Sequence, residues 1–222
     1  MDMLRLEGTP GIDVALRVSA RARRLTLRIA PGGQAVLTRP PRATRAEAER
    51  FARAQEPWLR RTLVAHAPLH PRAGGTLPVE GRDLPIRTGT PRLGADAVAL
   101  PLGREGPAAA RLLKSLARTR LAEAAGRHAA ALGRPHGRLT LRDTRSRWGS
   151  CAASGALGFS WRLVMAPPEV LAYVAAHEAA HLVHMDHSRA FWGVVERLDP
   201  DWRARRGWLR AHGAALHRWR FE

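Results

Sequence analysis

Apolar and polar residues alternate through most of residues 1–40. The alternation covers residues 12–18 and 25–29, and residues 34–38 continue it after the turn signal Pro31-Gly32-Gly33. Because successive side chains of a strand point to opposite faces, this period of two predicts strands that bury one face. Short turns favour antiparallel pairing between such strands. The N-terminal region is therefore expected to be rich in antiparallel strands.

Helical spacing follows in two places. Thr44 and Glu47 have the spacing of a capping box, which predicts one helix that begins after Thr44 and that Pro57 kinks. Residues 107–132 carry leucines at helical spacing and predict a second helix. Residues 67–106, which lie between the two, are rich in Pro and Gly and predict a further strand pair connected by loops.

The most apolar segment is residues 170–185, which are apolar on nearly every side and predict a helix buried in a core. Residues 139–142 and 157–163 precede it and alternate as strands. The second of these strands offers an edge on which an extended peptide could lie. Asp199 is expected to cap a closing amphipathic helix that begins at Pro200.

These elements predict an α+β fold. Antiparallel strands packed with helices form the N-terminal part, and the buried helix forms the core of the C-terminal part. We divide the chain into a strand-rich region with one helix at residues 1–106 and a second region at residues 107–222. A chain of 222 residues can bury one substantial core, so we expect the two regions to form one compact unit together.

The charge adds a candidate partner. Lys and Arg number 37 against 19 acidic residues, which gives a net charge of +18. Such a balance raises nucleic acid as a partner. Lys114 is the only lysine, and the arginines recur throughout the chain, so the sequence defines no single basic patch. We expect non-specific attraction to polyanions rather than a specific nucleic-acid site.

Compartment signals point to the cytoplasm. The N-terminal residues MDMLRLE contain no continuous apolar region, and no run approaches the roughly eighteen apolar residues of a membrane span. Cys151 is the only cysteine, which excludes an internal disulfide and is typical of a reducing compartment. We expect a cytoplasmic protein without membrane contact. Cys151 is interpreted as a small packed residue, in preference to a nucleophile or a metal ligand.

The buried helix carries the candidate chemistry. His177-Glu178-Ala179-Ala180-His181 is an H-E-x-x-H pattern. Residues four apart share a helical face, so the two imidazoles can converge on one metal ion while Glu178 reaches the same space. Zinc prefers such nitrogen ligands, and a nearby carboxylate can take a proton from water. The alternative is a pair of hydrogen-bonded core histidines with Glu178 paired to an arginine.

Two histidines compete to be the third ligand. His184 would share the helical face of His177, but on a straight helix it lies about 10 Å along the axis. His187 is the better choice if the helix breaks around Met185-Asp186 and the chain turns back. Ser188 supports such a break, because it can cap a new helix. We favour His187 and expect His184 to support the site or contact the substrate.

Three segments carry a family resemblance. Residues 146–151 read SRWGSC, residues 159–163 read FSWRL and residues 177–192 read HEAAHLVHMDHSRAFW. In this order they resemble the bacterial YgjP-like metallopeptidases, relatives of the SprT-like group. Ser160 stands where that family usually has Asn, and Ala179 where it often has a larger aliphatic residue.

The resemblance implies a zincin-like catalytic region at residues 107–222. It implies that His177, His181 and His187 hold one Zn²⁺ per chain and that Glu178 is the catalytic base.

Besides His184, three residues are candidates for contact with the substrate or support of the site. Arg147 and Arg162 could orient a substrate carbonyl or carboxylate, although ordinary salt bridges are the simpler interpretation. Tyr173 lies one turn before His177 and could face the site, although core packing is again simpler. Trp148 and Trp161 are interpreted as core residues rather than a platform for substrate.

The sequence therefore predicts a zinc-dependent hydrolase, most simply a metallopeptidase that acts on a peptide or protein. Two alternatives remain open. One is a zinc hydrolase of a nucleotide or phosphate substrate, although no glycine-rich phosphate loop is evident. The other is a basic protein associated with nucleic acid that carries an accessory zinc site. The sequence predicts neither the cleavage preference nor the oligomeric state.

Overall fold

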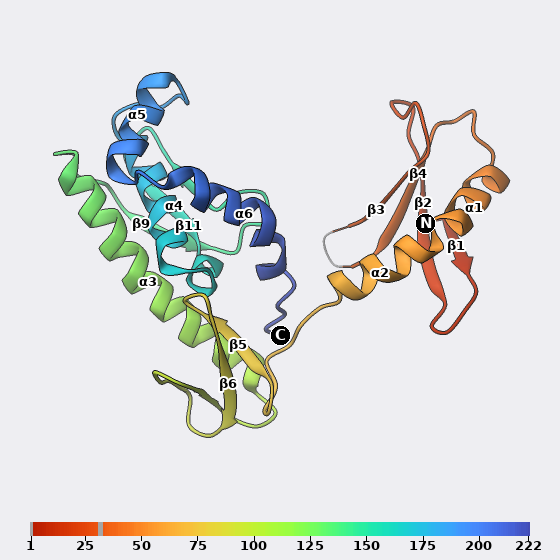
Figure 1. Ribbon diagram of the computed structural model, residues 1–222, viewed down its shortest axis with the longest axis horizontal. Helices are drawn as coiled ribbons and strands as arrows, with labels where there is room; N and C mark the ends of the chain where they lie inside the picture. The colour runs from red at the N-terminus through yellow and green to blue at the C-terminus, as the bar shows by residue number, and fades with distance from the viewer. Residues whose placement is uncertain (1, 31–32) are drawn as a thin grey trace. The chain divides into compact units, whose positions relative to one another are not determined.

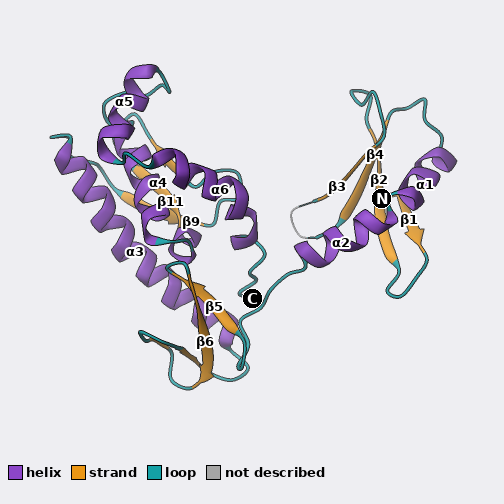
Figure 2. Cartoon of the chain, in the orientation of Figure 1, coloured by secondary structure: helices purple, strands orange, loops and turns teal. Residues whose placement is uncertain are grey.

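The computed structural model describes residues 2–30 and 33–222 (Figure 1). The chain divides into two compact units, Met1–Leu69 and His70–Glu222. Pro31 and Gly32 of the expected turn lie outside the described residues, whereas Gly33 N donates to Ala30 O at 3.0 Å. Helices and strands occur in both units, so the α+β class is confirmed (Figure 2).

The N-terminal unit is a four-stranded sheet with two helices. Its strands, in the order β1-β2-β4-β3, are β1 (Asp2–Leu6), β2 (Ile12–Val18), β4 (Ala35–Arg39) and β3 (Thr26–Ile29). Two of the three pairings are antiparallel, as expected, but β2 and β4 run parallel. Apolar side chains from the strands and helices form its core: Leu4, Leu6, Ile12, Val14, Leu16, Leu37, Ala48, Ala52 and Leu59.

The single helix expected after Thr44 is two helices, α1 (Arg45–Ala54) and α2 (Glu56–His66). The capping box is confirmed, because Thr44 and Glu47 bond to each other's backbone N–H. The helix is interrupted at Gln55. Pro57 lies in the first turn of α2, where its missing N–H removes no helical hydrogen bond. Pro57 therefore begins a new helix rather than kinking a long one.

Strands β5 (Thr76–Val79), β6 (Arg82–Thr88), β7 (Arg92–Leu93) and β8 (Val98–Leu100) form a sheet in the order β5-β6-β8-β7. This sheet belongs to the C-terminal unit. Glu80 N donates to Val164 O at 2.7 Å, and Arg120 Nε donates to Glu80 Oε1 at 2.6 Å. Because these bonds tie the sheet to the later part of the chain, the boundary lies after Leu69 and not at the expected residue 106.

The remaining elements of the C-terminal unit are the three strands of a small sheet and the helices around it. They are α3 (Glu105–Ala131), β9 (Leu139–Arg142), β10 (Gly149–Cys151), β11 (Leu157–Ser160), the 3-10 helix η1 (Trp161–Met165), α4 (Pro168–Ala180), α5 (Arg189–Leu198) and α6 (Trp202–Leu216). Helix α4 is almost wholly buried, as expected, and packs against α3, α5, α6 and β10. The sheet order is β10-β11-β9, so β11 is central and β10 is an edge.

Three element boundaries differ from the sequence prediction. The second strand ends at Ser160 instead of continuing to residue 163, because residues 161–165 turn into η1. Helix α4 ends at Ala180, before the expected break at Met185-Asp186. Helix α6 begins at Trp202, because Asp199 ends α5 instead, and its carboxylate accepts from Asp201 N at 3.2 Å.

Within the described part of the chain, none of the helices combines the length and apolar character that crossing a membrane requires.

Candidate metal centre

Three histidine side chains meet at the C-terminal end of α4. His177 lies in the helix, His181 is the C-cap residue that follows its end at Ala180, and His187 lies in the loop before α5. One ligand atom from each lies within 4.8 Å of the other two, and His187 Nε2 is 3.2 Å from His177 Nε2. Among the described residues, no other group of three His, Cys, Asp or Glu side chains is arranged to hold a metal ion.

The early end of α4 brings His187 to this group. Leu182 N donates to Ala179 O at 2.9 Å and His184 N donates to Ala180 O at 3.0 Å, so the helix closes with a tight turn. The chain then reverses towards α5, which Ser188 caps by accepting from Phe191 N at 3.4 Å, as expected. The structure thus brings His187, rather than the His184 side chain, to the other two histidines.

His184 contributes its backbone to the centre. The Nδ1 atom of His181 lies 3.0 Å from the carbonyl oxygen of His184. A carbonyl only accepts, so this bond places the proton of His181 on Nδ1 and leaves Nε2 free to bind a metal. His184 thus supports the His181 ring through its backbone while its side chain lies outside the group of three, and its side-chain identity is not needed for this bond.

Aromatic side chains of α5 enclose the three rings. Phe191 is fully buried, and its ring centroid lies 4.9, 4.5 and 4.8 Å from those of His177, His181 and His187. Trp192 lies 5.6 Å from His177 and 6.0 Å from His187. These contacts restrict the rotamers of the imidazoles and keep water from one side of the group.

The donor set fits a zinc ion. Burial, reinforced by the neighbouring His181 and His187, lowers the pKa of His177 to about 4, and burial also lowers the pKa of His181. Both rings are therefore neutral near pH 7, the form that binds a metal. Ligand atoms around a tetrahedral zinc lie roughly 3.3 Å apart, and three imidazoles leave its fourth position open. The pair His177 Nε2 and His187 Nε2 already has that spacing.

Glu178 is buried beside the three histidines, and little nearby positive charge stabilises its ionised form. Only 5% of its surface is exposed, and burial raises the pKa of its carboxyl to about 8, although the charge of Arg147 acts in the opposite direction. Its side chain lies against the backbone of Gly149 in β10. A Cβ atom at position 149 would lie 2.6 Å from Glu178 Cγ. Glycine at this position therefore provides the space that the carboxyl group occupies.

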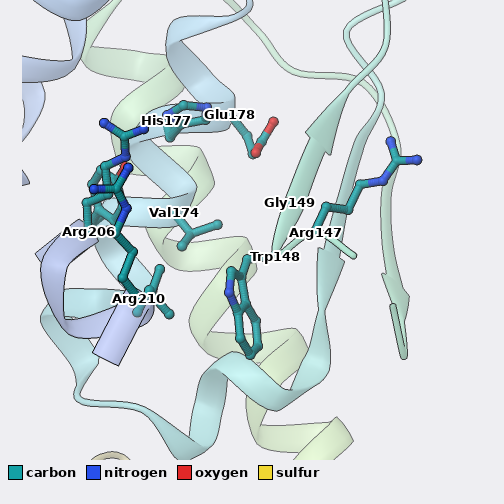
Figure 3. Close-up of a pocket in the computed structure, with 10 residues that line it drawn as sticks. Arg147, Trp148, Gly149, Val174, His177, Glu178, Arg206 and Arg210 are labelled. Carbon is teal, nitrogen blue, oxygen red and sulfur yellow. The ribbon is translucent and has the colours of Figure 1, made fainter. Parts of the chain in front are cut away.

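A pocket of about 310 Å³ opens beside Glu178 and His177 (Figure 3). Tyr173 and Trp148, which we interpreted as core residues, line it, and Tyr173 is also buried as that interpretation expects. Arg147 also lines the pocket, and its guanidinium points away from Glu178 (Figure 3).

Arg162 lies elsewhere. Its guanidinium donates to both carboxylate oxygens of Asp143 at 2.6 and 3.1 Å, and to the carbonyls of Leu216 and Trp219 at 2.9 and 3.0 Å. These bonds occupy the buried side chain, so it ties the C-terminal segment to η1. The salt-bridge interpretation holds for Arg162.

Trp161 and Cys151 also have structural surroundings. Trp161 is buried against Phe221, with ring centroids 5.2 Å apart, and is a core residue as expected. Cys151 lies in β10 and outside the histidine group. Burial, together with the charge of Glu178, raises the pKa of its thiol, which opposes a role as nucleophile.

Sequence reasoning missed the contributions of α5 and α6. Phe191 encloses the histidines, and Arg206, Leu209 and Arg210 form one wall of the pocket. The positions of the three α6 residues, three and four apart, show that they share one helical face. Nothing in the sequence indicated that this face turns towards α4.

Comparison with protein families gives one match. The model of the family described as YgjP-like, metallopeptidase domain, matches residues 23–212. The comparisons with curated proteins and with solved structures give no match.

Proposed function

Because the chain belongs to the YgjP-like metallopeptidase family, we propose that it is a zinc-dependent peptidase with a zincin-like core. Its centre holds one Zn²⁺ per chain through His177, His181 and His187. The observation that carries the proposal is the convergence of these three imidazoles beside the buried carboxyl group of Glu178. Neutral nitrogen ligands with a neighbouring carboxylate are the set that hydrolytic zinc sites use.

Glu178 is the general base of the proposed reaction. When bound, zinc supplies a Lewis acid that polarises a carbonyl group and makes water more acidic. A cation beside Glu178 also favours its ionised form, which opposes the effect of burial on its pKa. The carboxylate then takes a proton from the attacking water and delivers it to the departing amine. Gly149 and the turn of α4 hold the carboxyl group where both transfers can occur.

The strand that we expected to offer a docking edge, β11, is paired on both sides, so that prediction is wrong, and strand β10 is the proposed docking edge for an extended substrate instead. It pairs with β11 on one side only, and no strand of the described chain pairs with its other side. Helix α4 packs against β10, so a peptide added at this edge would pass close to Glu178. Backbone hydrogen bonds along an edge are indifferent to side-chain identity, so this edge supplies affinity without sequence preference.

Cleavage of defined pools tests the reaction class. Purified protein with zinc is incubated with a peptide pool and, in parallel, with pools of nucleotides and phosphate esters, and products are identified by mass spectrometry. We expect peptide cleavage that stops on chelation and returns with added zinc. Cleavage confined to the nucleotide or phosphate pool would replace the proposal by the non-peptide alternative.

A further inference from the structure

The pocket beside Glu178 has walls of two different kinds. One wall comes from α4 and the segment that leads into β10, and the other from α6 (Figure 3). Val174 and Tyr173 are buried, and Trp148 is held by stacking on His217 at 4.9 Å between ring centroids. The α6 wall carries Arg206 and Arg210. The pocket thus joins an apolar floor to the two positive charges of the α6 wall, with His177 and Glu178 alongside and Arg147 at the opposite wall.

The arginines of α6 fall into two groups. Arg203 and Arg205, which do not line the pocket, form ion pairs. Their partners are Glu196, Asp199 and Asp201. Arg206 and Arg210 line the pocket, and no Asp or Glu side chain of the described residues lies within salt-bridge distance of either. The charges that face the pocket are therefore the ones that the protein leaves uncompensated.

Arg206 is nevertheless held in place. Its guanidinium lies 5.1 Å from the centroid of Trp192 and 6.0 Å from that of Trp202, and the two indoles stack on each other at 4.3 Å. A cation over aromatic faces is positioned without being neutralised. Trp192 also contacts the rings of the candidate metal centre, so Arg206 has a fixed relation to that centre. A guanidinium prepared in this way favours a planar carboxylate, which it can bind in a bidentate manner.

We propose that this pocket binds a carboxylate of the peptide substrate next to the bond that is cleaved, so that the enzyme prefers acidic peptides. This inference rests on the proposed peptidase function. The apolar floor takes the methylene groups of the bound residue, and Arg206 and Arg210 take its carboxylate. The volume of about 310 Å³ is enough for one side chain. The carboxylate comes either from an Asp or Glu side chain or from the C-terminus of the substrate, since both present the same group.

Four matched peptide pools separate the two sources. The pools are identical except that Asp and Glu are present or replaced by Asn and Gln, and that the C-terminus is a free acid or an amide. Preference for Asp and Glu whatever the terminus identifies the side chain, and preference for the free acid whatever the side chains identifies the terminus. We expect the preferred pool to be cleaved with kcat/KM about tenfold higher, the range that a charge-assisted hydrogen bond contributes. Equal cleavage of all four pools would overturn the inference.

Two variants locate the preference. Arg206→Gln and Arg210→Gln should each lower the ratio of kcat/KM between the preferred and the neutral pool by about 5- to 10-fold. The control is Arg118→Gln, which removes the same charge from an exposed position of α3 that does not line the pocket. Loss of the preference in the control as well would show an effect of net charge and would overturn the assignment to α6.

Binding measurements distinguish a failure of this inference from a failure of the proposed function. The affinity of the four pools is also measured for Glu178→Gln protein, which retains the pocket. Carboxylate-dependent binding without any cleavage by the unaltered enzyme would uphold the pocket and refute the peptidase. Cleavage without carboxylate preference would uphold the peptidase and refute the pocket. A single-stranded oligonucleotide is the third probe, and if the arginine variants weaken only its binding, the pocket is a nucleic-acid contact instead and the inference fails.

Discussion

At the scale of residues, burial determines the protonation of the centre. Burial raises the pKa of Glu178 to about 8 and lowers the pKa of His177 to about 4, so without a cation both groups are neutral near pH 7. A neutral imidazole is ready to bind a metal, and a buried carboxyl group becomes a base when a cation arrives. The same burial therefore prepares both functions. The sequence predicted these residues from spacing alone, but the Gly149 contact required coordinates.

The third ligand is tested by zinc content. We expect His187→Ala to lose most of its zinc on dialysis, because two imidazoles cannot replace three. His184→Ala should keep about one zinc per chain, since His184 acts through its carbonyl oxygen. Metal analysis of both proteins against the unaltered chain gives the answer. Retention by His187→Ala together with loss by His184→Ala would assign the ligand to His184.

The substitution Gly149→Ala tests whether the space at position 149 is needed to position the Glu178 side chain. Gly149→Ala should leave zinc content unchanged but lower kcat by about 10- to 100-fold, because the new Cβ displaces the Glu178 side chain. Gly126→Ala is the control, since a Cβ there has no neighbour within 4 Å. Peptide cleavage and metal analysis are measured on both. If Gly149→Ala retains full activity, the glycine does not position the base.

At the scale of elements, two of the three expected helix caps were predicted correctly, whereas Asp199 ends α5 instead of beginning α6. The caps at Thr44 and Ser188 were predicted correctly because a capping side chain bonds within its own segment. The end of α4 at Ala180 was not, because residues 181–185 have the same apolar pattern as the helix. The strand predicted over residues 157–163 was also too long, because the chain forms η1 from Trp161 onwards. Burial in the core, rather than sheet pairing, accounts for the apolar residues of η1.

The Arg162–Asp143 pair is tested by stability. Burial raises the pKa of Asp143, but the hydrogen bonds and charge of Arg162 lower it by more. A carboxyl group with a depressed folded-state pKa stabilises the fold above its unfolded pKa of about 3.9, and this contribution is lost as pH falls through the folded value. Because the Asp143 side chain is 48% exposed and solvent screens the pair, Asp143→Asn should lower the free energy of unfolding by only about 1 kcal/mol at pH 7.

Urea unfolding at several pH values measures this difference. The gap between Asp143→Asn and the unaltered protein should begin to narrow below about pH 4, where the unfolded carboxyl group takes up a proton, and should close as the pH falls through the depressed folded-state pKa of Asp143. Glu196→Gln is the control, as its pair with Arg203 is exposed, and about 0.5 kcal/mol or less is expected. A difference that is the same at pH 3 and pH 7 would show that the charge of Asp143 is not responsible.

At the scale of the whole molecule, two units carry one family signature. The match over residues 23–212 includes parts of both, while every residue of the candidate centre lies in His70–Glu222. The sequence prediction placed the boundary between the units too late, because the pattern of the short strands before α3 does not reveal their hydrogen bonds to η1. Part of the net charge of +18 has a structural place: several arginines form ion pairs within the chain, and three line the pocket. A role for the remaining charge in nucleic-acid binding stays a prediction.

The central claim is that a histidine-bound metal and Glu178 together hydrolyse a peptide bond. The most direct test measures zinc content and peptide turnover on the same preparations of the unaltered protein and Glu178→Gln. We predict about one zinc per chain in both, with kcat lower by about 10²- to 10⁴-fold in the variant, the range for loss of a general base. A zinc-loaded Glu178→Gln protein that cleaves peptides at the unaltered rate would contradict the account.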